Sequence, residues 1–431
     1  MAILQRQHIL HLTLLEGVGP AAIMRIVAAA ERDFFVGSGG IYDARELDFV
    51  RLGFSSALAQ KIVSGLRDAV TLEKELTLIQ RYAISWATIF EPEYPALLKH
   101  IHLPPSVLYW QGDLASQSSG ASDRSSQENS KAPTFALVGS RNANWYGKQA
   151  IDLFVSPLVA QGCVIVSGGA LGADSMAHAA TIQAGGKTIA VLGSGLLDPY
   201  PASNTFLFSQ ITQNGGAVVS PFPLLMHASP GSFPARNRVI AGMSSGCIVV
   251  QAAVKSGALI TARFALEQGR DVFAVPGPIE DPVSAGCHAL IKEGAHLVTC
   301  AADVLGEYAQ LLAPMRGAVS ERTAQASLFG QGTLTGELSI QEQKKSHRIA
   351  REFQGVEGAG SSMQNHEQAE SAIDVRTPQG HIMHCCTTPQ SLDDLAAQTG
   401  LTFAQLYELL FELQMQGVLA QNAVGMWQRS R

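Results

Sequence analysis

The amino-acid sequence predicts an α/β protein built on a parallel sheet, with a helical domain before the sheet and a winged helix after it. Two observations carry this prediction. Hydrophobic residues make up 46% of the 431 residues, charged ones only 15%, and 41 residues are glycine, a composition typical of apolar strands that alternate with Gly-rich turns. In the middle of the chain, short β-branched runs alternate with helical stretches, which indicates strands buried on both faces.

The charge balance and the cysteines limit the class of protein. Thirty Lys and Arg against 36 Asp and Glu give a net charge of −6, which argues against a basic surface that coats nucleic acid or an anionic membrane. The six cysteines are scattered and do not suggest a secreted disulfide framework. No apolar run reaches about 18 residues, and the first residues lack a signal-peptide pattern. We therefore expect a cytoplasmic protein without a membrane span, in which any polyanion site is local.

Two polar segments divide the chain. Residues 115–132 and 308–378 are rich in Ser, Gln, Gly and Ala and poor in aromatic residues, so they bury too little apolar surface to offset the entropy of ordering. The predicted organisation is a helical domain at 1–85, a sheet domain at 86–307 with a disordered insert at 115–132, a flexible linker at 308–378 and a winged helix at 379–431.

The first block begins with helical spacing and a glycine turn. Apolar residues with helical spacing precede Gly17-Val18-Gly19-Pro20, and a second helical pattern follows. This arrangement predicts a helix-hairpin-helix, in which glycines let backbone N–H groups approach a DNA phosphate and Pro20 begins the second helix. A plain turn between two helices of a small helical domain explains the pattern equally well.

The central block is the most informative part of the sequence. Its predicted strands alternate with predicted helices at Gly147–Gln161, Ser175–Ala184 and Ala258–Gln268. Several strands run directly into Gly or Pro at the carboxyl edge, where open α/β sheets bind their ligands. The predicted strands are Thr134–Val138, Cys163–Ser167, Thr188–Leu192, Ala217–Ser220, Cys247–Val250 and Val272–Val275.

The last block has the pattern of a winged helix. A helical stretch ends in a turn at Gly400, a second helix covers Leu401–Gln416, and a short hairpin follows. The second helix has no Arg or Lys but contains Glu408 and Glu412, which favours contact with a protein over reading of a DNA groove. The preceding motif His381, His384, Cys385 and Cys386 lies within six residues and has no second ligand pair, so no metal site is expected.

Gly139-Ser140-Arg141 follows the first predicted strand of the central block. Two small residues allow main-chain N–H groups to point at a phosphate, and Arg141 supplies a charged, bidentate donor at the same place. A tight turn with an exposed Arg is the alternative interpretation. That alternative is weakened because glycines recur at the other strand ends.

A second Gly-rich turn contains Gly168, Gly169 and Gly172. It differs from the dinucleotide fingerprint GxGxxG, and no acidic residue follows about 20 residues later, so neither NAD nor another cofactor is expected. Asp174 and His178 lie four residues apart on one helical face and could act as an acid–base pair. The favoured interpretation is structural, with Asp174 steadying a partly buried His178.

Arg236-Asn237-Arg238 is the densest positive patch of the central block. Two arginines flanking an asparagine suit contacts with successive phosphates, although either arginine could instead pair with a carboxylate inside the fold. Lys255 offers another cation before a predicted helix. On sequence alone, Lys187 is best explained as a solvated side chain. The cations at strand ends and helix starts could converge on one edge of the sheet.

These segments together resemble one protein family. The chain carries VGSRNANWYG from Val138, SGGALGADSMAHAATI from Ser167, FPARNRVIAG from Phe233 and HALIKEGA from His288. In this order they resemble the DNA-processing protein A (DprA/Smf) family of bacteria, whose members often carry an N-terminal helix-hairpin-helix or sterile-alpha-motif-like (SAM-like) domain and a C-terminal winged helix. The resemblance implies an extended Rossmann-like fold that binds single-stranded DNA, forms a homodimer and helps load the RecA recombinase in natural transformation, with no established catalytic activity.

Carried over motif by motif, the resemblance assigns DNA binding to most of the candidates above and to Lys187. Gln251 and His288 depart from the family pattern, where Glu and Asn are common, which puts in doubt any role ascribed to those two positions. The long linker is also unusual. With Lys255 added from the residue pattern, the predicted DNA-binding residues are Gly139, Ser140, Arg141, Gly168, Gly169, Gly172, Lys187, Arg236, Asn237, Arg238 and Lys255.

Three functions remain open on the sequence. The leading hypothesis is a non-catalytic single-strand binder that hands DNA to a recombinase. An enzyme such as a nucleotide phosphoribohydrolase is the alternative, but the chain has Ser256-Gly257-Ala258 in place of a PGGxGT-like segment, and Gln251 cannot act as a general base. A winged-helix regulator that senses a nucleotide is disfavoured by the acidic second helix.

Overall fold

The computed structural model describes residues 4–32, 34–35, 40–114, 133–312, 377–415, 418–421 and 426–429. The predicted disordered insert at 115–132 and all but the ends of the predicted linker at 308–378 lie outside these residues. Within the described ranges, no helix is both long enough and apolar enough to cross a membrane.

A nine-stranded sheet forms the centre of the molecule, in the order β1-β2-β6-β5-β4-β3-β7-β8-β9. The seven strands from β6 to β9 are parallel, and β2 and β1 extend the sheet in antiparallel fashion beside β6. The strands are β1 (Ser85–Thr88), β2 (Val107–Gly112), β3 (Thr134–Val138), β4 (Val164–Gly168), β5 (Thr188–Val191), β6 (Ala217–Ser220), β7 (Gly246–Val249), β8 (Asp271–Ala274) and β9 (His296–Leu297).

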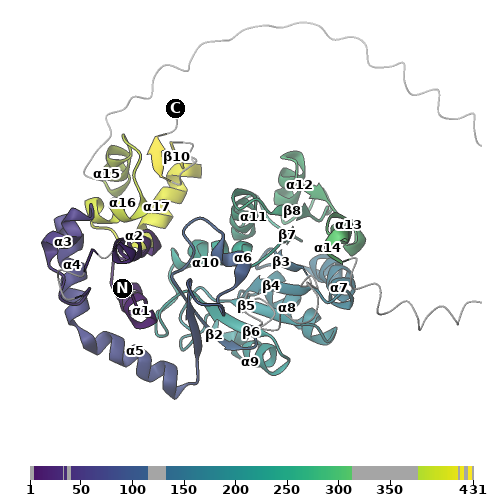
Figure 1. Ribbon diagram of the computed structural model, residues 1–431. Helices are drawn as coiled ribbons and strands as arrows, with labels where there is room; N and C mark the ends of the chain where they lie inside the picture. Colours follow the sequence, from purple (N-terminus) through teal and green to yellow (C-terminus); the bar gives the residue numbers. More distant parts are fainter. Residues whose placement is uncertain are drawn as a thin grey trace, which may run out of the picture.

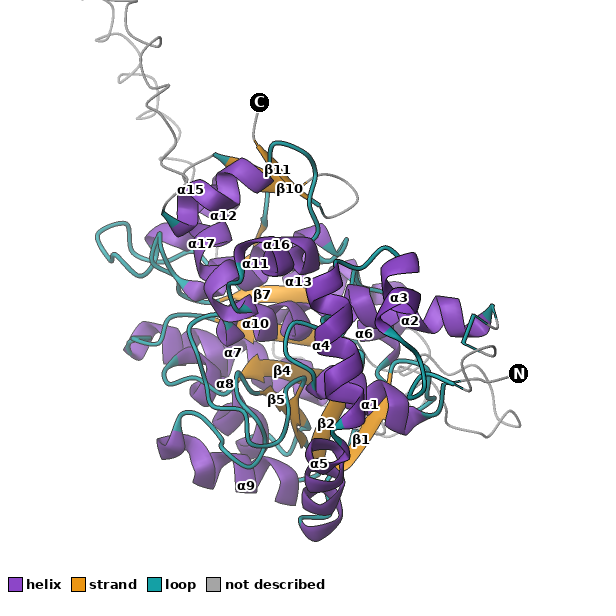
Figure 2. Ribbon diagram, turned by 90° about the vertical axis from the view of Figure 1, so that its left-hand side faces the viewer, coloured by secondary structure: helices purple, strands orange, loops and turns teal. Residues whose placement is uncertain are grey.

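Helices cover both faces of this sheet, because alternate side chains of each strand enter different hydrophobic cores. On β3, Phe135 and Leu137 pack with α7, whereas Ala136 and Val138 pack with α10 and α11. Figure 2 shows the strands in the middle of the block with helices on either side. The helices of this block are α6 (Ala96–Lys99), α7 (Trp145–Ala160), α8 (Ala173–Gln183), α9 (Thr205–Gln213), α10 (Ser232–Gly242), α11 (Gly257–Glu267), α12 (Ala285–Lys292), α13 (Ala301–Glu307) and α14 (Ala309–Leu312), with a short 3-10 turn η3 (Ala202–Asn204) before α9.

The N-terminal block is helical (Figure 1). The turn between the first two helices contains Gly17 at φ +83° and leads to Pro20 at the first position of α2, a geometry that both the helix-hairpin-helix and the plain turn predicted. This block shares a hydrophobic core with the sheet domain, and polar contacts also join the two. The Arg6 guanidinium lies over the Trp86 ring of β1, and the buried Glu75 carboxylate accepts a hydrogen bond from the Leu224 amide at 2.9 Å. The helices are α1 (Arg6–Leu14), α2 (Pro20–Glu31), α3 (Glu46–Arg51), α4 (Ser56–Arg67) and α5 (Ala69–Arg81).

The C-terminal block is a winged helix, as predicted. Helices α15 (Pro378–Cys385), α16 (Leu392–Thr399) and α17 (Phe403–Met415) precede an antiparallel hairpin of β10 (Leu419–Gln421) and β11 (Trp427–Arg429). Helix α16 ends at Gly400, which adopts a left-handed φ of +69°. The hydrophobic core of the winged helix includes Ile382, Leu395, Leu406, Leu410, Leu413 and Trp427.

Candidate nucleic-acid interface

The turn after β3 carries Arg141 and is packed tightly onto the start of α8. The Ser140 amide donates to the Gln251 carbonyl at 2.6 Å, and the Ser140 carbonyl accepts from the Ala173 amide at 3.0 Å. A Cβ on Gly139 would approach the Ala173 Cβ to 2.7 Å. These main-chain groups of Ser140 are therefore used within the fold, whereas Arg141 in the same turn is exposed.

The three glycines at and after the end of β4 are required by close packing. Gly172 has a φ of +78°, and a Cβ there would overlap the Arg141 carbonyl. Gly168 lies against the Asp174 carboxylate and the Arg236 guanidinium, and Gly169 lies against Leu192. These glycines bring the turn after β4 against the turn that carries Arg141.

Arg236 is buried at the start of α10 and is anchored inside the fold. It is 5% exposed, its Nε donates to the Asn237 Oδ1 at 3.1 Å, and its Nη1 donates to the Val191 carbonyl. Burial raises the pKa of the nearby Asp174 carboxyl, and the positive charge of Arg236 opposes that shift. The Arg236 guanidinium is thus fixed in position by the fold, unlike a flexible cation at the surface.

Arg141 and Arg236 meet aromatic side chains at a small hollow. The Arg141 guanidinium lies 5.2 Å from the centroid of the Phe233 ring, and the Tyr200 and Phe233 rings are 5.7 Å apart at 56°. A cation held beside the exposed Tyr200 ring and the partly buried Phe233 ring offers a phosphate partner and a surface on which a base can stack. The hollow is lined by Arg141, Ala170, Leu171, Tyr200, Pro201, Phe233 and Arg236.

The other predicted cations, Lys187, Arg238 and Lys255, do not line the hollow. Lys187 precedes β5, at the amino end of the parallel strands, and its Nζ lies 3.1 Å from the Asp113 carboxylate. Arg238 donates from Nη1 to the His102 carbonyl at 3.3 Å. Lys255 is exposed in the turn between β7 and α11, at the carboxyl edge. The structure therefore groups Arg141 and Arg236 with the glycines and places neither Lys187 nor Arg238 at the hollow.

Tyr200 and Phe233 line the hollow, and neither is among the residues that the sequence predicted for the candidate site. Each stands directly before a proline in a segment that follows a strand, in Tyr200-Pro201 and Phe233-Pro234. Tyr200 remains 49% exposed. Aromatic residues at the carboxyl edge of an open sheet are the sequence signal for base stacking.

The favoured interpretation, in which Asp174 steadies a partly buried His178, is wrong about the partner: His178 is hydrogen-bonded to Gly168 and Thr188, and Asp174 accepts from the Ala170 amide. The His178 ring is fully buried, with Nε2 at 2.9 Å from the Gly168 carbonyl and Nδ1 at 2.7 Å from the Thr188 hydroxyl. Because a carbonyl only accepts, Nε2 carries the proton. Burial lowers the pKa of His178 to about 4. Both ring nitrogens are thus engaged within the fold, which weakens the acid–base interpretation.

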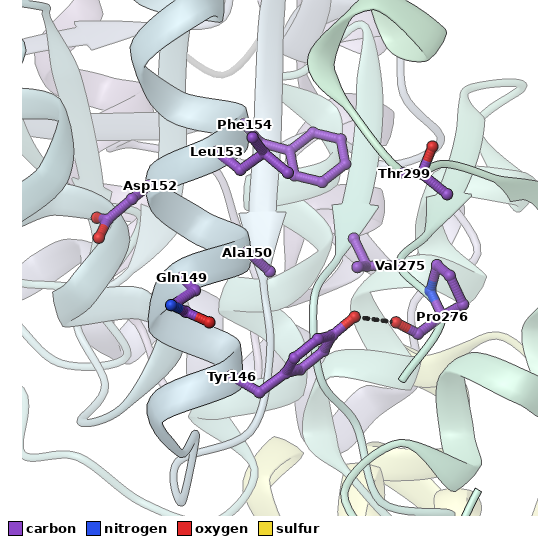
Figure 3. Close-up of a pocket in the computed structure, with 9 residues that line it drawn as sticks. All are labelled: Tyr146, Gln149, Ala150, Asp152, Leu153, Phe154, Val275, Pro276 and Thr299. Atoms are coloured by element: carbon purple, nitrogen blue, oxygen red, sulfur yellow. Dashed lines mark hydrogen bonds between the residues drawn. The ribbon is translucent and has the colours of Figure 1, made fainter. Parts of the chain in front are cut away.

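A larger cavity of about 550 Å³ lies apart from the predicted cations, between α7 and the end of β8 (Figure 3). The Tyr146 hydroxyl donates to the Pro276 carbonyl at its rim. In the part of the chain that the structure describes, no group of three His, Cys, Asp or Glu side chains could hold a metal ion. The cavity is lined by Tyr146, Gln149, Ala150, Asp152, Leu153, Phe154, Val275, Pro276 and Thr299.

The doubly wound sheet and the hollow at its carboxyl edge define a Rossmann-type ligand-binding protein. Residues 85–309 match the family model described as DNA recombination-mediator protein A, and residues 387–423 match the DprA winged helix domain. The first match covers more than half of the chain, and the chain belongs to this DNA recombination-mediator protein A (DprA/Smf) family. The family resemblance drawn from the sequence is confirmed.

Named relatives and a solved structure agree with this assignment. The chain is 50% identical over 170 residues to Protein Smf of Escherichia coli (strain K12), a stretch that covers 39% of this chain and 46% of that protein. It is 39% identical over 236 residues to the DNA processing protein DprA of Bacillus subtilis (strain 168), a stretch that covers 55% of this chain and 75% of that protein. The X-ray structure of DNA processing protein A from Streptococcus pneumoniae matches with a TM-score of 0.57 and 34% identity, covering 70% of this chain and 98% of that one.

Proposed function

We propose that this protein binds single-stranded DNA at the hollow and passes it to a recombinase. The observation that carries the proposal is the joint placement of Arg141, Phe233 and Tyr200 at the carboxyl edge. Arg141 supplies the charge for a phosphate, and the rings supply faces for a base. In a duplex the base faces are covered by their neighbours, so a site built on stacking favours a single strand.

The charge distribution supports a local site of this kind. The central block, residues 134–307, has nine basic and ten acidic side chains, so it is nearly neutral and its long-range attraction of a polyanion is weak. Affinity at the hollow then depends on a few placed groups rather than on a general positive surface. Sequence preference is expected to be small, because every base has a face to stack and every nucleotide has a phosphate.

The family supports the place of this binding in recombination. Its model is described as a DNA recombination mediator, and the relatives reported above are named for DNA processing. The protein in this proposal acts in the cytoplasm as a homodimer, without catalytic activity, and delivers DNA to the RecA recombinase during natural transformation. The sheet domain at 86–307 binds the strand. The helical domain at 1–85 and the winged helix at 379–431, the latter tethered by the linker at 308–378, provide contacts with other macromolecules.

Fluorescence anisotropy with a labelled oligonucleotide, single-stranded or annealed to its complement, tests the proposal across a salt series. We expect preference for the single strand and an affinity that falls with salt. Arg141→Ala should weaken binding to all sequences alike by roughly tenfold, the cost of one charge-assisted hydrogen bond. It should also reduce the salt slope by about 0.7 for each lost phosphate contact. Unchanged affinity in Arg141→Ala would overturn the proposal.

Lys187→Ala is the matched control, because Lys187 is also exposed and basic but lies at the amino end of its strand beside Asp113. It should leave single-strand affinity unchanged. The phosphoribohydrolase alternative predicts release of product from nucleoside monophosphates by the purified protein and its loss in Asp174→Asn. That result would replace a binding role with a catalytic one.

A further inference from the structure

The Gln251 side chain is fully buried at the end of β7, against the turn that carries Arg141. Its Oε1 accepts from the backbone N–H of Asn144 at 3.1 Å, and its Nε2 donates to the side-chain Oδ1 of Asn144 at 2.9 Å. Its backbone carbonyl accepts from the Ser140 amide. Gln251 therefore holds both ends of the segment from Ser140 to Asn144, with Arg141 between them.

The Asn144 side chain joins two further groups in the same network. Its Oδ1 also accepts from the Gly147 amide at 3.2 Å and so caps the N-terminus of α7. Its Nδ2 donates to the Asp281 Oδ2 at 2.8 Å. Because an ionised carboxylate only accepts and the Gln251 Nε2 only donates, these two neighbours together determine which end of the Asn144 amide faces each of them.

Asp281 is itself held in place by the segment after β8. Its Oδ1 accepts from the Val283 amide at 3.1 Å. The same segment is braced by the Tyr146 hydroxyl on the Pro276 carbonyl (Figure 3) and by the His288 Nε2 at 3.0 Å from the Gly277 carbonyl. The ends of β3, β7 and β8, three adjacent strands, are thus connected through Asn144.

We propose that Gln251 and Asp281 are positioning residues for nucleic-acid binding, which hold Asn144 in one orientation and thereby order the turn of Arg141. The inference rests on the proposed function, since Arg141 is its point of contact with DNA. An ordered turn loses less conformational entropy when the guanidinium engages a phosphate, so loosening it lowers affinity without removing a contact. This assigns a role to Gln251, one of the two departures from the family pattern, and Gln rather than Glu is the type that the network requires.

Gln251→Glu and Gln251→Met test the positioning role. Glu keeps the size and the acceptor but turns a carboxylate towards the Asn144 Oδ1, and Met keeps the length without either hydrogen bond. Each should weaken single-strand binding by roughly three- to tenfold, the range for loss of one or two hydrogen bonds. In an Arg141→Ala background the same changes should have no further effect, because their influence passes through Arg141. An equal loss in both backgrounds would overturn the inference.

Asp281→Asn, added to Gln251→Glu, is the compensating change. Asn144 can then invert its side-chain amide, with Nδ2 towards Glu and Oδ1 towards the new amide at 281. Inversion gives up the hydrogen bond from the Gly147 amide, so only part of the lost affinity should return. General destabilisation by Gln251→Glu would instead be deepened by a second substitution. Gln268→Glu is the matched control, because Gln268 is a partly buried amide whose Nε2 donates to the Arg238 carbonyl. It should leave binding unchanged.

Hydrogen exchange separates failure of this inference from failure of the proposed function. Amides from Ser140 to Gly147 should exchange faster in Gln251→Met than in the parent protein, with melting temperatures that show both to be folded. That readout needs no DNA. If the parent protein does not bind single strands, the proposed function is wrong. Hydrogen exchange then decides by itself whether Gln251 orders this segment. If exchange across this segment is unchanged in Gln251→Met, the positioning role is wrong.

Discussion

The Arg141 guanidinium lies 5.2 Å from the centroid of the Phe233 ring, although 92 positions separate the two residues in the sequence. The turn after β3 supplies the arginine, and the first turn of α10 supplies the ring. A cation over an aromatic face is held by the ring quadrupole, which contributes about 0.5–1 kcal/mol at exposed sites. Phe233 therefore limits where the Arg141 charge can lie.

Phe233→Ala should weaken single-strand binding more than Phe233→Tyr, which preserves the ring. Loss of a stacked base and of the support for Arg141 is worth about 1–3 kcal/mol, or roughly five- to a hundredfold in Kd. Anisotropy with a labelled oligonucleotide measures the change. Phe90→Ala, at a partly exposed phenylalanine two residues after β1, is the control. Equal affinities for Phe233→Ala and the parent protein would contradict the stacking role.

Gly172→Ala should destabilise the protein and weaken DNA binding, because the new Cβ would overlap the Arg141 carbonyl at a φ of +78°. Gly185→Ala isolates the backbone cost, since Gly185 has a similar φ of +72° and open space around its Cβ position. We expect about 1 kcal/mol for Gly185→Ala and about 3 kcal/mol for Gly172→Ala in urea unfolding. Only the latter should change DNA affinity. Equal losses of unfolding free energy in the two variants would show that the backbone readily shifts to relieve the contact between the new Cβ and the Arg141 carbonyl.

His178 should make stability fall as the solution is acidified from pH 7 to pH 5. Its pKa is about 4 in the fold and 6.5 when exposed, so between these values the unfolded chain binds a proton that the folded chain excludes. Stability from this residue is complete above pH 6.5 and is lost as pH falls towards 4, by about 2 kcal/mol at pH 5.

The difference in unfolding free energy between the parent protein and His178→Gln isolates this residue, because the other histidines titrate in both. That difference should narrow by about 2 kcal/mol from pH 7 to pH 5. NMR titration of the His178 ring offers a direct reading in the parent protein. A ring that titrates near pH 6.5 in the folded state would contradict the prediction.

Glu75→Gln should stabilise the junction between the helical domain and the sheet at alkaline pH. Burial raises the pKa of Glu75, so its contribution to stability is complete below the pKa of the unfolded chain and is lost as pH rises through the folded pKa. Gln still accepts from the Leu224 amide but carries no charge. The unfolding free energy of Glu75→Gln should equal that of the parent protein near pH 4 and exceed it by on the order of 1 kcal/mol at pH 8.

Thermal unfolding of the two proteins across this pH range provides the measurement. Glu73→Gln, at an exposed neighbour on α5, should show no such trend. A parent protein that gains stability over Glu75→Gln as pH rises would mean that the ionised carboxylate is favoured in the fold, contrary to the direction of its pKa.

The strands of the central block were predictable because each is a short β-branched run bounded by Gly or Pro. The predicted Thr134–Val138 and Ala217–Ser220 coincide with β3 and β6, and the other four differ from their strands by a single residue at one or both ends. The antiparallel pair β1 and β2 and the two-residue β9 were not predicted. Their pairing comes from neighbours distant in sequence, such as Tyr109 opposite Ser220, and leaves no local periodicity.

The sequence alone determined the family, the parallel sheet, the winged helix and the edge at which the glycines and Arg141 gather, because these depend on local patterns and on the direction of parallel strands. Only the tertiary structure decided which cations belong together. Arg236 and Arg238 are two residues apart on α10 and so point roughly 200° away from each other, one towards Asp174 and the other towards His102. Packing around the helix, which no local pattern records, buries Arg236 at the hollow beside Phe233 and turns Arg238 away from it.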